Sequence, residues 1–215
     1  MSSGTPASTK PRSRVAFLGF VCGLAGLAAL AVSAIGYRLA WWPVTTALSL
    51  AEGGAYAAVA GLVLSLAGFL LGLRRRAGRG MVLGLLGLIA ALPVVVLAGH
   101  WVYATRHYPP INDISTDTED PPIFWDMPNP SEYPGGRTAE LQRANYPDLD
   151  SLNLQAAPER VFALALEIAQ DSGWEVVAEA PGEGRIEAVV TSRLYGFKDE
   201  VVIRIEAGDG ATVVL

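Results

Sequence analysis

A cluster of four arginines between two long apolar runs is the feature that most constrains how this chain can fold. Its members are Arg74, Arg75, Arg76 and Arg79. An uncharged run of roughly 20 residues is long enough to cross the ~30 Å hydrocarbon core of a bilayer as a helix. The chain contains three such runs, at residues 15–37, 53–73 and 81–103, and the arginines lie between the second and the third. We therefore predict a membrane domain of three transmembrane helices over residues 15–103.

The distribution of positive charge predicts the orientation of these helices, because cytoplasmic loops of membrane proteins carry an excess of Lys and Arg. Three cations lie in the N-terminal tail (residues 1–14), which we expect to be disordered, whereas the loop between the first two spans carries Arg38 alone. We therefore expect a cytoplasmic N-terminus and a cytoplasmic arginine cluster, so the four arginines determine the topology. Residues 104–215 then lie outside, which in a bacterium means a multi-pass inner-membrane protein with a periplasmic domain. Cleavage of the first run after Ala34, as a signal peptide, is an alternative that would leave this placement unchanged.

Glycines spaced four residues apart recur in the spans, and such pairs allow helix backbones to approach closely in lipid. The pairs are Gly19 and Gly23, Gly68 and Gly72, and Gly80 and Gly84. They indicate either packing among the three helices of this chain or association with another membrane subunit. His100 is the one histidine within a span. Since no second histidine is present there to complete a bis-histidine pair, we predict no haem and no other cofactor.

The two halves of the chain differ sharply in charge. Residues 1–103 carry eight Lys and Arg against one acid, whereas residues 104–215 carry eight against twenty. Clustered cations are needed to bind phosphate, so the acidic half argues against a nucleic-acid partner, and anionic lipid headgroups would repel it as well. The single cysteine, Cys22, excludes an intrachain disulfide.

Residues 104–150 form a Pro-rich segment, which we call the arm. Proline removes a hydrogen-bond donor and favours extended backbone before it, so we predict an extended, irregular segment. The arm also carries aromatic residues such as Trp125, so it should pack on its own domain or on a partner. Asp113 and Asp117 have the alternating spacing of a calcium-binding loop, but Thr118 and Phe124 replace its glycine and glutamate. We therefore predict no metal site of this kind and keep both aspartates as candidate interaction residues.

The pattern after residue 150 predicts a small α+β domain, residues 151–215. Pro158 suits the first turn of a helix and Gly173 suits its C-terminal cap. The apolar stripe between them consists of Val161, Phe162, Leu164, Ala165, Ile168 and Ala169. From Trp174 onward apolar and polar residues alternate, interrupted by turns at residues 181–184, 196–200 and 208–210. We predict one helix packed on an antiparallel sheet of about four strands.

Charged residues of these strands complete the list of candidate interaction residues. We expect strand pairing to bring Asp199 and Glu200 near Arg185 and Arg204. Ion pairs on the solvent-exposed face of the sheet are the simplest interpretation, and an anion or partner site is the sharper one. The sequence has no nucleophile elbow, phosphate-binding loop or metalloprotease motif, so we predict no catalytic residues and no enzyme. Hydrolysis by a carboxylate pair is the alternative.

Several segments in the same order resemble the domain-of-unknown-function 1499 family. They are PPINDISTDTEDPP in the arm, YPD at Tyr146–Asp148, GW at Gly173–Trp174, GRIEA at Gly184–Ala188 and GFKDEVVIRI at Gly196–Ile205. The resemblance runs from about Tyr108 to the end of the sequence, and it implies a bacterial or plastid envelope protein without an established activity. Family members continue with a further strand and a final helix, so the resemblance implies that this domain either is truncated in mid-strand or departs from the family pattern.

Together these observations predict a non-enzymatic inner-membrane protein that presents an acidic periplasmic domain to a partner, such as an envelope protein or a membrane complex. The alternative is a carrier of lipid or another apolar ligand, because a helix on a curved sheet can enclose an apolar cavity. Packed side chains between helix and sheet would argue against the carrier.

Overall fold

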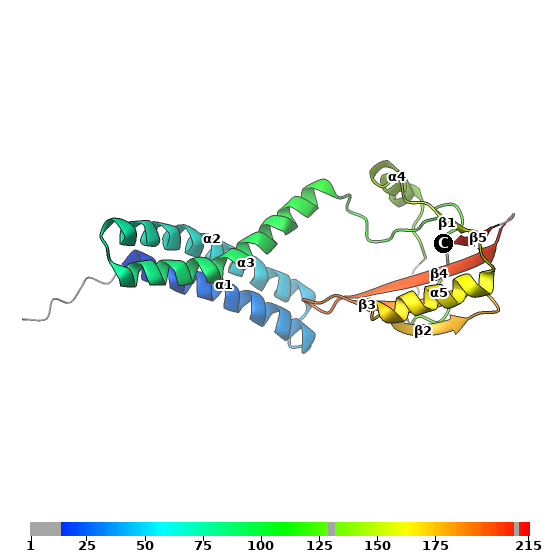
Figure 1. Cartoon of the computed structure of the whole chain (residues 1–215), viewed down its shortest axis with the longest axis horizontal. Coiled ribbons are helices and arrows are strands. Elements are labelled where there is room, and N and C mark those ends of the chain that lie inside the picture. Colours follow the sequence, from blue (N-terminus) through cyan, green and yellow to red (C-terminus); the bar gives the residue numbers. More distant parts are fainter. Residues whose placement is uncertain (1–13, 129–131, 209–210) are drawn as a thin grey trace, which may run out of the picture. The chain divides into compact units, whose positions relative to one another are not determined.

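The structure is a computed structural model that describes residues 14–128, 132–208 and 211–215 (Figure 1). The chain divides into two compact units, Met1–Ala104 and Thr105–Leu215. The predicted N-terminal tail and the turn at residues 208–210 fall wholly or in part outside the described residues.

The N-terminal unit consists of three long apolar helices, α1 (Arg14–Arg38), α2 (Val44–Arg74) and α3 (Gly78–His107). All three are long and apolar enough to cross a membrane, as expected of a multi-pass membrane protein. The predicted start of the second helix is wrong: α2 begins at Val44 rather than at residue 53. An uncharged run marks only the part of a helix that lipid can cover, and α2 extends beyond that run toward the N-terminus, through Glu52. The Glu52 carboxylate accepts a hydrogen bond from Tyr56 Oη at 2.9 Å. Similarly, α3 extends beyond residues 81–103 at both ends.

Glycines of the paired motifs lie where the helices of this chain meet. A Cβ on Gly23 would be 2.8 Å from the carbonyl oxygen of Gly87 in α3, and a Cβ on Gly84 would be 2.8 Å from the backbone of Phe69 in α2. A Cβ on Gly68 would be 2.5 Å from the backbone of α1. These contacts favour packing within the chain over association with another subunit as the role of these glycines.

The C-terminal unit contains two helices, α4 (Gly136–Asn145) and α5 (Pro158–Asp171), and one antiparallel sheet. The strands are β1 (Leu152–Leu154), β2 (Glu175–Ala180), β3 (Arg185–Thr191), β4 (Lys198–Ala207) and β5 (Thr212–Val214), in the order β1-β5-β4-β3-β2. The α+β class is confirmed, but the sheet has five strands rather than about four. The additional strand, β1, is three residues long and therefore too short to show an alternating pattern.

Helix α5 covers one face of the sheet. Its Val161 and Phe162 pack with Ile186 of β3 and Ile205 of β4 to form the core of the unit. The predicted apolar stripe is partly wrong, because Leu164 and Ile168 are exposed on the outer side of α5. The six apolar positions span a wider arc than a single sheet can contact, and the sequence does not indicate which edge of that arc remains outside.

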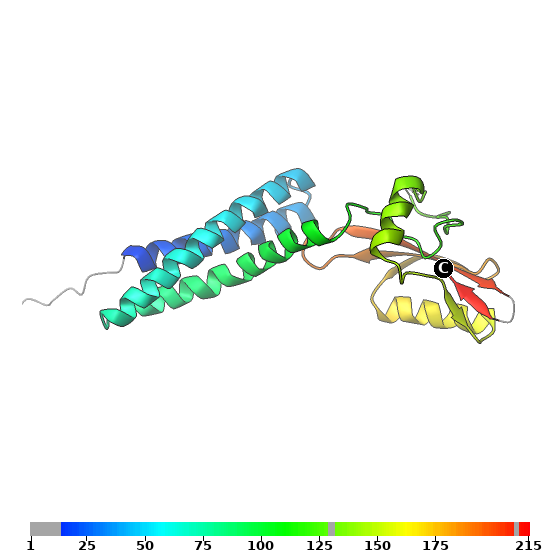
Figure 2. The ribbon, with the colours of Figure 1, turned by 90° about the horizontal axis from the view of Figure 1, so that it is seen from above.

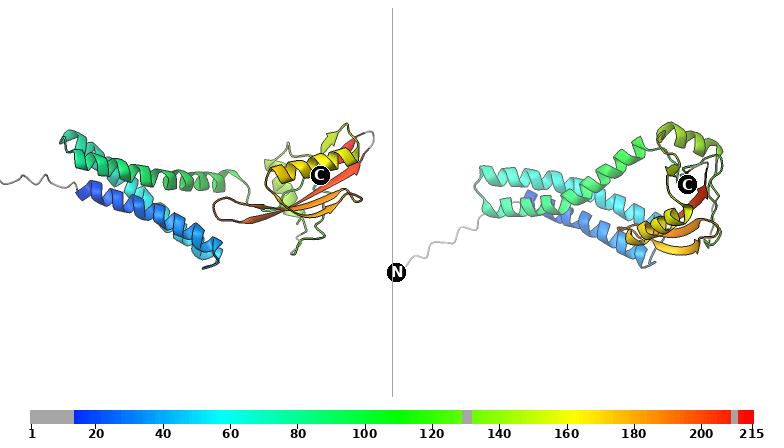
Figure 3. Two further views of the ribbon diagram at one scale, coloured as in Figure 1. Left: turned by 60° about the horizontal axis from the view of Figure 1, so that its bottom comes forward. Right: turned by 45° about the vertical axis from the view of Figure 1, so that its right-hand side comes forward.

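The arm covers the opposite face of the sheet, and Figure 2 shows α5 and the segment with α4 on the two sides of the strands. The views in Figure 3 agree with this three-layer arrangement. Strand β3 is consequently buried on both faces, from Ile186 through Val189. The arm therefore packs on its own domain, and the prediction that it is irregular throughout is wrong, because residues Gly136–Asn145 form α4.

Candidate functional site

The arm is fastened to the sheet by Glu187, a fully buried carboxylate in β3. Residues 185 and 187 have side chains on the face opposite α5, because side chains alternate along a strand. Glu187 Oε1 accepts the backbone N–H of Trp125 at 2.7 Å, and Oε2 accepts the N–H of Asp126 at 3.0 Å. Burying a charge is costly unless it is paired and hydrogen-bonded, and the two consecutive amides together with Arg185 meet that requirement.

Arg185 joins the arm and the sheet through its own carboxylate contacts. Its Nη1 contacts both Glu187 and Asp126, the latter at 2.9 Å, and its Nη2 lies 3.0 Å from Glu183 Oε2. These carboxylates, with Asp126 the largest influence, raise the pKa of Arg185 above its ordinary value. The guanidinium also lies over the Trp125 ring, 5.8 Å from its centroid. Arg185 is therefore held at the centre of the arm–sheet contact.

Arg204 provides a second attachment point beside the first, because β3 and β4 pair with Arg185 directly opposite Arg204. Arg204 Nη2 donates to the backbone oxygen of Asp120 at 2.9 Å and contacts its carboxylate at 3.0 Å. Its Nε lies 3.0 Å from Glu206 Oε1. Two like charges directly opposite each other would be unfavourable alone, so the arm's aspartates contribute charges that this face of the sheet requires.

The predicted pairing of the two arginines with Asp199 is wrong. Asp199 lies opposite Val190 and Glu200 lies opposite Val189, near the other end of β4. Five residues of strand separate Asp199 from Arg204, which corresponds to roughly 17 Å. The prediction failed because the strand register is not visible in the sequence, and because the partners of both arginines include residues of the arm, about sixty to eighty positions earlier in the chain.

A surface pocket of about 220 Å³ lies beside these contacts, and we call it the Trp125 pocket. It is lined by Pro122, Ile123, Trp125, Glu183, Arg185, Val202 and Arg204. Trp125 is 71% exposed and Ile123 is 55% exposed, although the backbone that carries Trp125 is bonded to a buried carboxylate. An exposed tryptophan on a fixed backbone next to an arginine is the composition typical of protein-binding hot spots.

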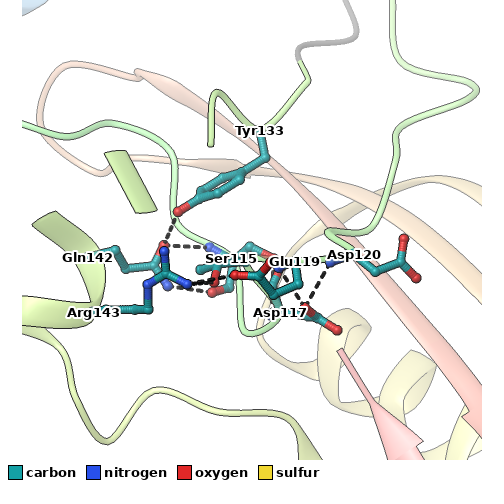
Figure 4. A network of polar contacts seen from close by, with 8 residues as sticks. Ser115, Asp117, Glu119, Asp120, Tyr133, Gln142 and Arg143 are labelled. Atoms are coloured by element: carbon teal, nitrogen blue, oxygen red, sulfur yellow. Dashed lines mark hydrogen bonds and ion pairs between the residues drawn. The ribbon is translucent and has the colours of Figure 1, made fainter. Parts of the chain in front are cut away.

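The other two candidate residues, Asp113 and Asp117, lie in the arm. Figure 4 shows the polar contacts that shape the loop around Asp117. Asp117 Oδ1 accepts the N–H groups of both Asp120 and Glu119 at 2.9 Å, and these two bonds lower the pKa of Asp117. The acidic loop is therefore closed by its own backbone amides. This arrangement orients Asp120, which carries the contact with Arg204.

Gln142 of α4 connects this loop to the rest of the arm. Its side chain is almost completely buried, donates to the Ser115 backbone oxygen at 2.5 Å and accepts from the Ser115 N–H at 3.1 Å. Gln142 Oε1 also accepts from Tyr133 Oη at 2.9 Å, and burial raises the pKa of Tyr133 (Figure 4). Asp113 is half-buried nearby, and its charge adds to that rise.

The arm–sheet contact is built from ion pairs. The carboxylates gathered at the arm–sheet contact are Asp120, Asp126, Glu183, Glu187 and Glu206, and each lies within 3.0 Å of a guanidinium group. Sequence reasoning identified both arginines but missed Glu187 and Trp125. The available signals were the Arg-x-Glu spacing in β3 and the aromatic content of the arm.

Comparison with known proteins agrees with the motifs. Residues 113–215 match the family described as "Protein of unknown function (DUF1499)". The chain is a DUF1499 family member. No curated protein and no solved structure matches it. The DUF1499 match begins at Asp113 and therefore includes most of the arm, as expected if the arm and the sheet fold as one domain.

Proposed function

We propose that this DUF1499 protein is a non-enzymatic protein of the bacterial inner membrane. It presents its C-terminal unit on the periplasmic side, where that unit binds a protein partner. The observation that carries the proposal is the exposed pair of Trp125 and Ile123 on a backbone anchored at Glu187. Exposed aromatic and aliphatic side chains on a fixed backbone lose little conformational entropy on binding, so they are efficient contacts for a partner.

The periplasmic placement rests on the charge distribution. The four arginines lie in the turn between α2 and α3 and in the helix ends beside it, whereas the turn between α1 and α2 carries no Lys or Arg and is preceded by Arg38 alone. A reporter that is active only outside the cytoplasm, fused after Leu215, should be active. A reporter that is active only inside should be silent there and active when fused after Arg76. The reverse pattern would overturn the placement.

The carrier alternative receives less support from the structure. A carrier would use the space between α5 and the sheet for its ligand, and in this chain Val161, Phe162, Ile186 and Ile205 pack against one another there. On the arm, by contrast, Ile123 and Trp125 are exposed beside a pocket. We therefore place the interaction on the arm side of the sheet.

Site-specific photocrosslinking in native membranes tests the binding proposal. The full-length chain would carry a benzophenone amino acid in place of Ile123 or, as the matched control, in place of Leu164 on the outer side of α5, which is also exposed. We expect a recurrent protein adduct from position 123 that is absent from position 164 and is lost when Trp125→Ala is added. No adduct from position 123, or the same adduct from both positions, would refute the proposal.

A further inference from the structure

We propose that the Trp125 pocket receives a cationic side chain, Lys or Arg, from an apolar segment of the partner protein. This inference rests on the proposed function and specifies the chemistry of the same surface. It begins from the charge at the pocket. Two guanidinium groups, Arg185 and Arg204, contact five carboxylates, which leaves an excess of three negative charges.

The excess negative charge is accessible from solvent. Glu187 is buried, whereas the side chains of the other four carboxylates, Asp120, Asp126, Glu183 and Glu206, are each more than half exposed. Glu183 lines the pocket, and the other three contact the two arginines that line it, so a partner group that enters the pocket approaches through a negative field. Such a field raises the association rate of cations and disfavours anions.

The lining of the pocket matches the two parts of a long cationic side chain. Pro122, Ile123 and Val202 offer apolar surface for a methylene stem, and Glu183 offers an exposed carboxylate for the charged end. The Trp125 ring already has the Arg185 guanidinium on one face, yet the side chain is 71% exposed, so the rest of the ring is available to a second cation. A volume of about 220 Å³ has room for one side chain and not for a folded element.

An anionic ligand fits this surface poorly, although two arginines line it. Arg185 is engaged by three carboxylates and Arg204 by two. The Nε atom of each arginine has no hydrogen-bond partner among the described residues, but it is buried and therefore out of reach of a phosphate or an acidic peptide. The arginines fasten the arm, and the excess carboxylates determine which charge the partner carries.

The experiment uses the same crosslinking position with two carboxylates neutralised. Glu183→Gln and Glu206→Gln together remove two exposed charges, while Arg185 keeps Asp126 and Glu187, and Arg204 keeps Asp120. The control pair, Glu167→Gln and Glu179→Gln, makes the same change in net charge at exposed positions of α5 and β2. Exposed ion pairs contribute ~0.2–1 kcal/mol each, so loss of two lowers the affinity roughly 2- to 30-fold.

We expect the yield of the position-123 adduct to fall by that factor in the first pair and to stay unchanged in the control pair. Salt of about 1 M, which shortens the Debye length to ~3 Å, should lower the yield in the unmodified protein as well. Mass spectrometry should map the attachment point on the partner to within a few residues of a Lys or Arg. If the yield of the partner adduct is unchanged both in the Glu183→Gln, Glu206→Gln pair and at high salt, the cationic inference is wrong and partner binding still stands. A lipid adduct, or none, would overturn both.

Discussion

Replacement of Glu187 by glutamine tests whether one buried carboxylate holds the arm on the sheet. Three donors point at this carboxylate: the N–H groups of Trp125 and Asp126 and the guanidinium of Arg185. Glutamine keeps the size of the side chain and one acceptor oxygen. Its NH₂ group, however, must face a donor, and Arg185 loses one of its three carboxylates.

The expected cost follows from these contacts. Removing one partner of a buried ion pair costs ~3–5 kcal/mol, and a donor left without an acceptor costs ~1–3 kcal/mol. Because Arg185 keeps Asp126 and Glu183, we take the lower end, about 3 kcal/mol. A domain of this size is stable by only ~5–15 kcal/mol, and about 1 kcal/mol shifts Tm by ~4–8 °C. Glu187→Gln should therefore lower Tm of the C-terminal unit by roughly 12–24 °C.

Hydrogen exchange locates the effect. In the full-length protein in nanodiscs, the amides of Trp125 and Asp126 should exchange about 100-fold faster in Glu187→Gln, since each 1.4 kcal/mol is a factor of ten. Glu179→Gln, an exposed change on β2, is the control and should leave both Tm and the exchange unchanged. If residues 122–127 keep their protection in Glu187→Gln, the conclusion that Glu187 fastens the arm is wrong.

Three further predictions concern other parts of the molecule. Gly61→Val should separate α1 from α2 and lower the yield of folded protein in membranes, because the valine side chain would meet the backbone of α1. Gly53→Ala, which has open space around it, should leave that yield unchanged. The yield of detergent-resistant monomer compares the two variants. Gln142→Leu should lower the free energy of unfolding by about 2 kcal/mol and Tm by roughly 8–16 °C. The reason is that it leaves the Ser115 N–H, the Ser115 carbonyl and the Tyr133 hydroxyl without their partner. Gln170→Leu, on the exposed side of α5, should leave Tm unchanged. The pKa of Asp117 is lowered in the folded chain, so the charged side chain stabilises the fold at a pH above 3.8, the ordinary pKa of an aspartate. This stabilisation is lost as the pH falls below that value. The Tm difference between wild type and Asp117→Asn should therefore be constant from pH 5 to 8 and change in favour of the variant below about pH 4, and a difference independent of pH would contradict this assignment.

The errors of the sequence-based prediction have a common physical origin. Helix α5 and strands β2 to β4 were predicted because each is long enough for its period to be visible. Strand β1 and helix α4 were missed because neither is recognisable from local pattern. The apolar side chains of β3 suggested one buried face, whereas the arm buries both. Asp199 was paired with the arginines of the sheet on an assumed strand pairing, while the actual partners are set by the observed register and by the path of the arm.

Sequence alone determined the membrane part of this protein and the family of its C-terminal unit. Both signals are carried by continuous stretches: uncharged runs of sufficient length, an arginine cluster, and motifs in a fixed order. Only the tertiary structure decided the candidate site, because Glu187, Arg185 and Trp125 come together through a sheet register and through a segment that crosses the face of the sheet. A buried carboxylate is stable only when its partners are in place, and no local property of the sequence identifies those partners.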